Sequence, residues 1–332
     1  MIVKKYKDIN SFRLKGKIMK DETCLANKRL CEKVTKSKNV SCLVCGNNES
    51  NNIVNIYGFN YVQCNNCSLV YIKNPSSTAE IEDIYNSDYY NKMVRDLQLS
   101  PEIAEYRVES IGKPKVSFIR EVISNNAKTW VDIGCGGGEI LSAAKDCGFK
   151  VEGIETNKEA VCYLRDHLGL KVTEMYITED SPGPIRESDI VSLFGVLEHL
   201  PNPKGLINIL GKYMHNGSYL IVEVPRFPSL SCLSQQMFPD LVNRVMAPPF
   251  HLSIFTEKSI DLLVEANNFS KIAVWHYGQD FYEFITTLAT KIDGLKSSDL
   301  WKTLVELIDK FQAVIDENNL NDEMLLIYNK TI

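Results

Sequence analysis

A glycine-rich loop follows an apolar run in the stretch WVDIGCGGGE, residues 130–139. Gly134, Gly136 and Gly138 keep a G-x-G-x-G spacing, so the backbone can approach a ligand closely. A dinucleotide-binding fingerprint would place its third glycine one residue later, where Glu139 stands. A pyrophosphate is disfavoured beside that carboxylate. The spacing therefore predicts a loop that holds a ligand without phosphate groups.

Two acidic residues accompany the loop. Asp132 lies just before it, and Glu155 lies seventeen residues after Gly138, at the end of the next apolar run. A carboxylate in the position of Glu155 can accept hydrogen bonds from both hydroxyls of a ribose, and this feature alone would suit NAD equally. The glycines and acidic residues together favour a ligand with a ribose, a positive charge and no phosphates. S-adenosylmethionine (SAM) has this chemistry.

Cysteines at metal-ligand spacing form a second chemical group. Two C-x-x-C pairs, separated by eighteen residues, are formed by Cys42, Cys45, Cys64 and Cys67. Two such turns facing each other supply four thiolates for a tetrahedral zinc ion, and a closed shell of this kind is structural because it leaves no position for water or substrate. Four ordinary thiols are the alternative. Of the six other cysteines, five are interpreted as ordinary thiols: Cys24, Cys31, Cys147, Cys162 and Cys232.

The elements that position the loop alternate between short apolar runs and amphipathic stretches. This order predicts a doubly wound, Rossmann-like α/β sheet, in which ligands bind beyond the carboxyl ends of the strands. Strands are expected at 129–134, 150–155, 189–196, 217–225, 270–278 and 322–330. Helices are expected at 138–149, 157–169, 202–214 and 257–267. The glycine loop lies at the first turn from strand to helix.

Composition and turn-forming residues divide the chain into four parts. We expect a basic amino-terminal extension over 1–38, a zinc-binding module over 39–75 and a helical connector over 76–127. The main domain then covers 128–332, with a helical insertion at about 281–320. Such an insertion could cover a pocket or form a dimer surface, and the sequence leaves the oligomeric state open.

Charge and hydropathy limit the classes of partner. The formal net charge is -5, yet the first 38 residues hold twelve Lys or Arg against four Asp or Glu. That segment is interpreted as a solvated arm, with contact to nucleic acid or a membrane surface as the alternative. No apolar run approaches the ~18 residues of a membrane span, and the first ten residues lack a signal-peptide apolar region. A soluble, cytoplasmic protein is therefore expected.

Several motifs in order resemble one protein family over residues 40 to about 280. They are the four zinc-type cysteines, SLVYIKNP with its downstream tyrosines, VDIGCGGG, GIE, DIVSLFGVLEHLPNP and HLSIFT. The chain resembles the class I SAM-dependent methyltransferases whose amino terminus holds a zinc-binding module, and is similar to sugar and natural-product methyltransferases. The resemblance implies a seven-stranded methyltransferase sheet beside a small zinc ribbon, with SAM and a structural Zn²⁺ bound.

The resemblance also implies where SAM lies. The loop from Gly134 to Gly138 would approach the amino-acid portion of SAM, and Asp132 would orient the methionine amine. Glu155 would bind the ribose. The segment LEHL, which contains Glu198, would lie at the cleft and face the transferable methyl group. Glu174 is a possible contact for the adenine amino group.

The same resemblance implies catalytic side chains. His251, in the loop PPFHLSIFT, corresponds to the general base of related sugar C-methyltransferases, and Phe250 stands where those enzymes have a glutamate. His199 is the second choice of base. Tyr90 is the candidate among three connector tyrosines, the others being Tyr85 and Tyr89. For each group, packing or structural hydrogen bonding is the alternative role.

The resemblance predicts methyl transfer to a small molecule. A nucleotide-linked sugar, or a precursor of a polysaccharide or natural product, is the expected acceptor. Two alternatives remain: an rRNA or tRNA methyltransferase with a zinc module, and a SAM-binding scaffold without catalysis. The acidic body and the lack of interleaved aromatic and basic residues argue against a nucleic-acid partner.

Overall fold

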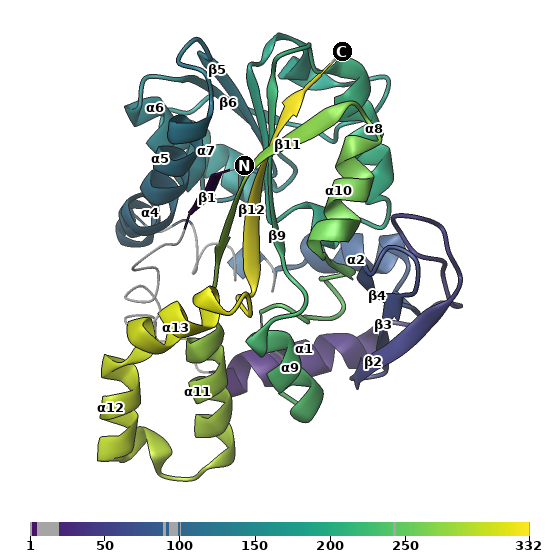
Figure 1. The fold of residues 1–332 in the computed structure, drawn as a ribbon, viewed down its shortest axis with the longest axis vertical. Coiled ribbons are helices and arrows are strands. Elements are labelled where there is room, and N and C mark those ends of the chain that lie inside the picture. Colours follow the sequence, from purple (N-terminus) through teal and green to yellow (C-terminus); the bar gives the residue numbers. More distant parts are fainter. Residues whose placement is uncertain are drawn as a thin grey trace.

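The computed structural model describes residues 2–4, 20–88, 91–92, 99, 101–241 and 244–331. Its centre is a mixed sheet with the strand order β1-β11-β12-β9-β8-β5-β6-β7 (Figure 1). These strands are β1 (Ile2–Lys4), β5 (Thr129–Ile133), β6 (Lys150–Glu155), β7 (Val172–Glu174), β8 (Ile190–Phe194), β9 (Tyr219–Pro225), β11 (Phe269–Tyr277) and β12 (Glu323–Lys330). Strands β5 to β9 pair in parallel, whereas β12 is antiparallel to both of its neighbours. The prediction of a doubly wound α/β sheet is confirmed.

The sheet has one strand more than the seven expected. Strand β1 pairs in parallel with the edge strand β11, with Ile2 opposite Ala273. Its residues come from the basic segment that was interpreted as a solvated arm. The arm interpretation is wrong for these three residues, because an unpaired sheet edge offers backbone hydrogen bonds that a nearby chain segment can complete.

Helices cover both faces of the sheet (Figure 1). They are α4 (Pro101–Arg107), the π-helix η2 (Val108–Gly112), α5 (Lys113–Val122), α6 (Glu139–Asp146), α7 (Lys158–Asp166), α8 (Pro203–Tyr213) and α10 (Glu257–Glu265). Side chains of β12 alternate between the two faces, as the period of a strand requires. Leu325 and Ile327 join the core beside α5 and α6, whereas Leu326 and Tyr328 join the core beside α8 and α10.

The cysteine-containing segment forms a second, antiparallel sheet, ordered β10-β4-β3-β2. Three of its strands are consecutive: β2 (Ser50–Ile56), β3 (Phe59–Cys64) and β4 (Val70–Ile72). The fourth, β10 (Ser253–Ile254), comes from the carboxyl-terminal half and pairs with β4. The cysteine module and the segment after His251 therefore share one sheet.

Helix α1 (Lys20–Lys33) packs against the rest of the protein. Cys31 is fully buried, and its core neighbours include Ile254 of β10 and Met246. The Cys31 thiol also donates to the carbonyl of Pro248 at 3.2 Å. The expected solvated arm is therefore wrong here too, because apolar positions near the end of the helix gain burial against a distant segment.

Further helices extend the molecule beyond the sheet (Figure 1). Helix α2 (Thr78–Tyr85) begins at a capping box formed by Ser77 and Glu80. Helix α9 (Leu230–Met237) lies next to α11 (Asp280–Lys291), which is followed between β11 and β12 by η5 (Leu295–Ser297), α12 (Asp299–Glu306) and α13 (Ile308–Glu317). Among the described helices, none combines the length and the apolar character that crossing a membrane requires.

Candidate functional site

A cavity of about 700 Å³ lies beyond the carboxyl ends of β5, β6 and β8. Its wall includes the glycine loop, the end of β6, the turn after β8 and helix α2. Residues of the cysteine module, Val40 and Leu43 among them, close another side. A doubly wound sheet places its ligands at this switch point. The cavity therefore unites the glycine loop with the LEHL segment, as expected from the order of the motifs.

The three glycines adopt left-handed backbone conformations. Their φ angles are 71° at Gly134, 50° at Gly136 and 78° at Gly138, a region that residues other than glycine rarely enter. A Cβ atom on Gly134 would lie 2.8 Å from the side chain of Val196, and one on Gly138 would collide with Leu164. At these two positions the protein itself excludes a side chain. The expectation that the ligand alone requires all three glycines is thus too simple.

Replacing Gly138 with alanine should lower the free energy of unfolding by about 2–4 kcal/mol, because a left-handed alanine and a collision with Leu164 both cost energy. Gly148→Ala is the matched control, since Gly148 has a φ of 88° but a Cβ atom added to it would have no neighbour within 4 Å. That variant should lose only about 1–2 kcal/mol. Urea unfolding measures both, and equal losses would contradict the packing argument.

The two predicted acidic residues both line the cavity. The carboxylate of Glu155 accepts hydrogen bonds from the backbone amides of Gly136 at 2.9 Å, Thr156 at 2.7 Å and Asn157 at 2.9 Å. Asp132 is 1 % exposed and accepts from the Ser192 hydroxyl at 2.6 Å. Burial raises the pKa of Asp132 to about 8. Both carboxylates keep further acceptor capacity for a ligand.

A cation in the cavity wall was not identified from the sequence. Arg107, the last residue of α4, forms an ion pair with Glu139 at the start of α6. Burial tends to raise the pKa of Glu139, but the guanidinium of Arg107 outweighs this effect and lowers it. Arg107 is the one cationic side chain among the described lining residues. No local spacing marks it, because its partner lies 32 residues along the chain.

Three side chains meet at the LEHL end of the cavity. His199 lines the cavity, and its ring meets that of His251 edge-on, with 4.7 Å between centroids. The Glu198 carboxylate lies 3.9 Å from His199 Nε2 and is 3 % exposed. Burial lowers the pKa of His199 to about 4, and burial with the neighbouring His199 lowers that of His251 to about 3. Both imidazoles are therefore neutral at pH 7.

Tyr85 is the one predicted tyrosine that the structure describes, and it lies at the cavity, whereas Glu174 does not. Tyr85 lines the cavity, and its hydroxyl lies 3.2 Å from His199 Nδ1. Tyr90 and Tyr89 lie outside the described residues. Glu174 is absent from the described cavity wall, where Tyr176 is found instead. The Glu174 carboxylate is paired with Lys158 at 3.9 Å.

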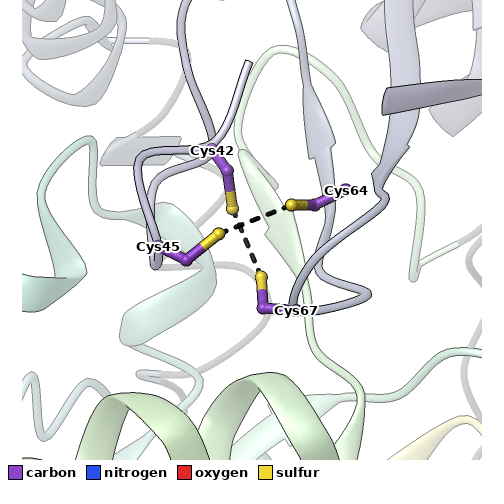
Figure 2. A group of neighbouring side chains, drawn as sticks. All are labelled: Cys42, Cys45, Cys64 and Cys67. Atoms are coloured by element: carbon purple, nitrogen blue, oxygen red, sulfur yellow. Dashed lines mark hydrogen bonds between the residues drawn. The ribbon is translucent and has the colours of Figure 1, made fainter. Parts of the chain in front are cut away.

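The four cysteines of the two C-x-x-C turns converge on one point (Figure 2). Cys42 and Cys67 lie 3.4 Å apart between sulfur atoms, and Cys45 and Cys64 lie 3.5 Å apart. All four sulfurs lie within 4.8 Å of one another. These spacings exceed the ~2.05 Å of a disulfide and approach the ~3.8 Å expected between tetrahedral ligands at ~2.3 Å from zinc. The predicted cluster is therefore present.

Backbone turns orient these thiols. Gly46 follows the first pair with a φ of 73°, and Ser68 follows the second with a φ of 65°. The Gly46 amide donates to the carbonyl of Cys42 at 2.9 Å, and the Ser68 amide donates to the carbonyl of Cys64 at 3.0 Å. A hydrogen bond from the Cys67 thiol lowers the pKa of Cys42 to about 5. The two turns thus share one geometry, although only the first has a glycine.

The cysteine module holds the backbone around His251. The Tyr61 hydroxyl donates to the carbonyl of His251 at 2.9 Å, and the Ile72 amide donates to the carbonyl of Leu252 at 3.0 Å. The Leu252 amide in turn donates to the carbonyl of Glu198 at 2.7 Å. These bonds connect the two sheets at the LEHL end of the cavity. No local pattern indicates this connection, because β10 begins at Ser253, far along the chain from the end of β4 at Ile72.

Comparisons with known proteins agree with this architecture. A family model described as "Methyltransferase domain" matches residues 104–274, just over half of the chain. The ubiquinone biosynthesis O-methyltransferase of Hydrogenovibrio crunogenus is 28% identical over 118 residues, covering 34% of this chain and 49% of that protein. The protein with the same description from Stutzerimonas stutzeri is 32% identical over 105 residues, covering 30% and 45%. The chain thus spans about half the length of the curated relatives it matches.

Solved structures of similar proteins include a SAM-dependent methyltransferase from Archaeoglobus fulgidus. It is 20% identical with a TM-score of 0.45, covering 73% of this chain and 100% of that chain. A magnesium protoporphyrin IX methyltransferase from Synechocystis, solved with bound SAH, is 15% identical with a TM-score of 0.48, covering 77% and 100%.

Proposed function

The chain belongs to the methyltransferase-domain family, and we propose that it transfers the methyl group of SAM to a small-molecule acceptor. The observation that supports this proposal is the single cavity that joins the glycine loop, Asp132 and Glu155 to His199. One end of the cavity offers carboxylates and backbone to a cationic nucleoside. The other end offers imidazole groups to an acceptor.

The cavity residues fit SAM by their chemistry. Glu155 would accept hydrogen bonds from the ribose hydroxyls, and Asp132 would lie near the methionine amine. Arg107 suits the methionine carboxylate, since a guanidinium can bind a carboxylate while still paired with Glu139. Gly136 already donates its amide to Glu155, which fixes that carboxylate at the loop. Tyr176 is the aromatic side chain that we propose contacts the adenine.

SAM supplies a methyl group on a sulfonium, and its leaving group is a neutral thioether. The protein therefore has to align the acceptor with the methyl group in a pocket that excludes water. We propose that the acceptor is a hydroxyl group, as the description of the curated relatives as O-methyltransferases suggests. A nucleotide-linked sugar, or a polysaccharide or natural-product precursor, is the acceptor class that we propose first.

His199 and His251 are the proposed activating groups. Because burial lowers the pKa of both imidazoles, neither is well matched to proton abstraction at neutral pH. The role of His251 as a general base stays a prediction, and the low pKa of its imidazole argues against it. His199 borders the cavity and would face the acceptor, with His251 and Glu198 directly behind it.

We propose that Cys42, Cys45, Cys64 and Cys67 hold a structural zinc ion. Four sulfur ligands suit zinc, and a four-thiolate shell leaves no position for a substrate. The ion would hold the two turns together and so support the strands that fix the backbone around His251. It would supply folding energy and take no part in methyl transfer.

The test of the function is incubation with labelled SAM and a panel of acceptors. The panel comprises nucleotide sugars, polysaccharide precursors, catechols and RNA. We expect label to enter a small hydroxyl-containing acceptor. Label in RNA would favour the nucleic-acid alternative. SAM binding without transfer to any acceptor, including a cell extract, would support the non-catalytic scaffold.

Replacing His199 with alanine should lower kcat by about 10²-fold or more, because the acceptor loses the side chain that would orient it toward the methyl group. Binding of the demethylated product, S-adenosylhomocysteine, should change less than about threefold, since the residue lies at the acceptor end of the cavity. His215→Ala is the matched control, because His215 lies outside the described cavity wall. Steady-state kinetics and calorimetry separate the two effects. Unchanged turnover in His199→Ala would remove this residue from the mechanism.

A further inference from the structure

Donor atoms of Glu198, His199 and His251 converge at one point. One nitrogen from each imidazole and one carboxylate oxygen all lie within 4.8 Å of one another. Two residues are adjacent in the chain, and the third arrives from the loop that precedes β10. Two imidazoles and one carboxylate form a ligand set that divalent transition metals occupy in proteins.

The two imidazoles are oriented for coordination. His251 Nδ1 lies 2.8 Å from the carbonyl of Val245, and His199 Nδ1 lies 3.2 Å from the carbonyl of Phe250. A carbonyl only accepts, so we assign the hydrogen to Nδ1 in both rings. The Tyr85 hydroxyl, also 3.2 Å from His199 Nδ1, then accepts from the same N–H. Each Nε2 then has a lone pair directed away from its carbonyl partner. Ligating histidines characteristically donate their other ring nitrogen to a carbonyl or carboxylate in this way.

Glu198 has no basic partner among the residues that the structure describes. Its Oε2 atom is buried without a hydrogen-bond partner among the described residues. Two carboxylates act on it electrostatically, and both have basic partners: Glu223 pairs with Lys115 at 2.6 Å, and Glu323 pairs with Arg244 at 2.6 Å. Among the described ion pairs, Glu198 is paired only with His199, and this imidazole is neutral and supplies no charge. A buried carboxylate of this kind is costly unless a proton or a cation neutralises it.

We propose that Glu198, His199 and His251 bind a divalent transition-metal ion at the acceptor end of the cavity. With bonds of ~2.1 Å, cis ligand atoms would lie ~3.0–3.4 Å apart. His199 Nε2 and Glu198 Oε1, now 3.9 Å apart, would approach by less than about 1 Å to reach that spacing. Three protein ligands leave coordination positions open, and His199 belongs to the cavity wall. Glu198 itself is not a lining residue. A Cβ atom on Gly195, which does line the cavity, would lie 3.5 Å from Glu198 Oε1, so the carboxylate lies directly behind this part of the wall.

The role of this ion rests on the proposed function. An acceptor hydroxyl bound at an open position would become more acidic and would release its proton to solvent as the acceptor enters, before water is excluded. The oxygen lone pair would then form the new bond to the methyl carbon while the carbon–sulfur bond breaks. The electron pair of that bond would remain on the sulfur, giving a neutral thioether.

The test uses the full chain and two probes, Mn²⁺ and Zn²⁺. Manganese avoids thiolate sites, so electron paramagnetic resonance of unbound Mn²⁺ reports sites with nitrogen and oxygen ligands. Elemental analysis after dialysis against Zn²⁺ counts all bound zinc. We expect wild type to bind one Mn²⁺ per chain. We also expect each wild-type chain to bind one Zn²⁺ more than a chain of Glu198→Gln or of His251→Ala binds. Both variants should bind Mn²⁺ at least about tenfold more weakly. His215→Ala should match wild type.

Binding of S-adenosylhomocysteine verifies that each variant is folded. Equal Mn²⁺ and Zn²⁺ binding by wild type and two folded variants would overturn the metal site and leave the proposed methyl transfer intact. Where one variant does not fold, the other and His199→Gln provide the comparison. Conversely, metal binding that follows these residues, in a chain that does not bind SAM, would retain the site and remove its proposed role.

Discussion

Glu155→Ala should weaken SAM binding by about 10²–10⁴-fold. The carboxylate would accept hydrogen bonds from both ribose hydroxyls, and bonds to a charged acceptor contribute about 1.5–3 kcal/mol each. The Glu155 carboxylate also accepts hydrogen bonds from the backbone amides of Gly136, Thr156 and Asn157. Removing this side chain should therefore loosen the loop that would border the cofactor. Calorimetry with SAM and with S-adenosylhomocysteine measures the loss.

Two variants separate the ribose contact from the support of the loop. Glu155→Gln keeps one oxygen for the backbone amides, and its affinity should lie between those of wild type and Glu155→Ala. Glu152→Ala is the matched control on the same strand, because Glu152 pairs with Lys171 at the surface and should bind SAM normally. Wild-type affinity in Glu155→Ala, or tight binding of NAD in place of SAM, would contradict the assignment of the cavity.

Cys42→Ser should release the proposed zinc ion and lower methyl transfer by at least about 100-fold. Structural zinc contributes about 10–16 kcal/mol to the folding of small zinc modules, and one lost thiolate opens the shell. Without the ion, β3 and β4 would no longer hold Tyr61 and Ile72 against the backbone of His251 and Leu252. The expected loss of activity is therefore indirect and acts through the loop.

Elemental analysis, thermal unfolding and turnover of Cys42→Ser together test this prediction. Cys162→Ser is the control, because the Cys162 thiol is exposed and lies on α7, away from the cluster. A chelator would be less informative, since it would strip the Glu198 site as well. Full turnover in a Cys42→Ser protein that has lost its zinc would show that the module and the cavity are not coupled.

Local patterns in the sequence predicted six of the eight strands of the main sheet and two candidate ligand groups. The alternation of apolar runs and amphipathic stretches marks those six strands, because the period of burial follows from the element itself, whereas the three-residue strands β1 and β7 are too short to show a period. The C-x-x-C spacing likewise predicts which four thiols meet, since each pair shares one turn. Gly134, Gly136 and Gly138 mark the proposed cofactor loop by their spacing. Only the structure shows why two of these positions exclude a side chain: Val196 packs against Gly134, and Leu164 packs against Gly138.

Tertiary structure decided every feature that depends on distant segments meeting. The pairing of Arg107 with Glu139, the burial of Cys31 on α1 and the pairing of β10 with β4 have no local signature. Motif resemblance singled out His251, yet its low pKa and its contact with His199 arise from burial among segments far apart in the chain. Spacing along a chain specifies which residues can share a turn or a face. Burial and charge at a site depend on every segment that packs around it, and these emerge only when the chain has folded.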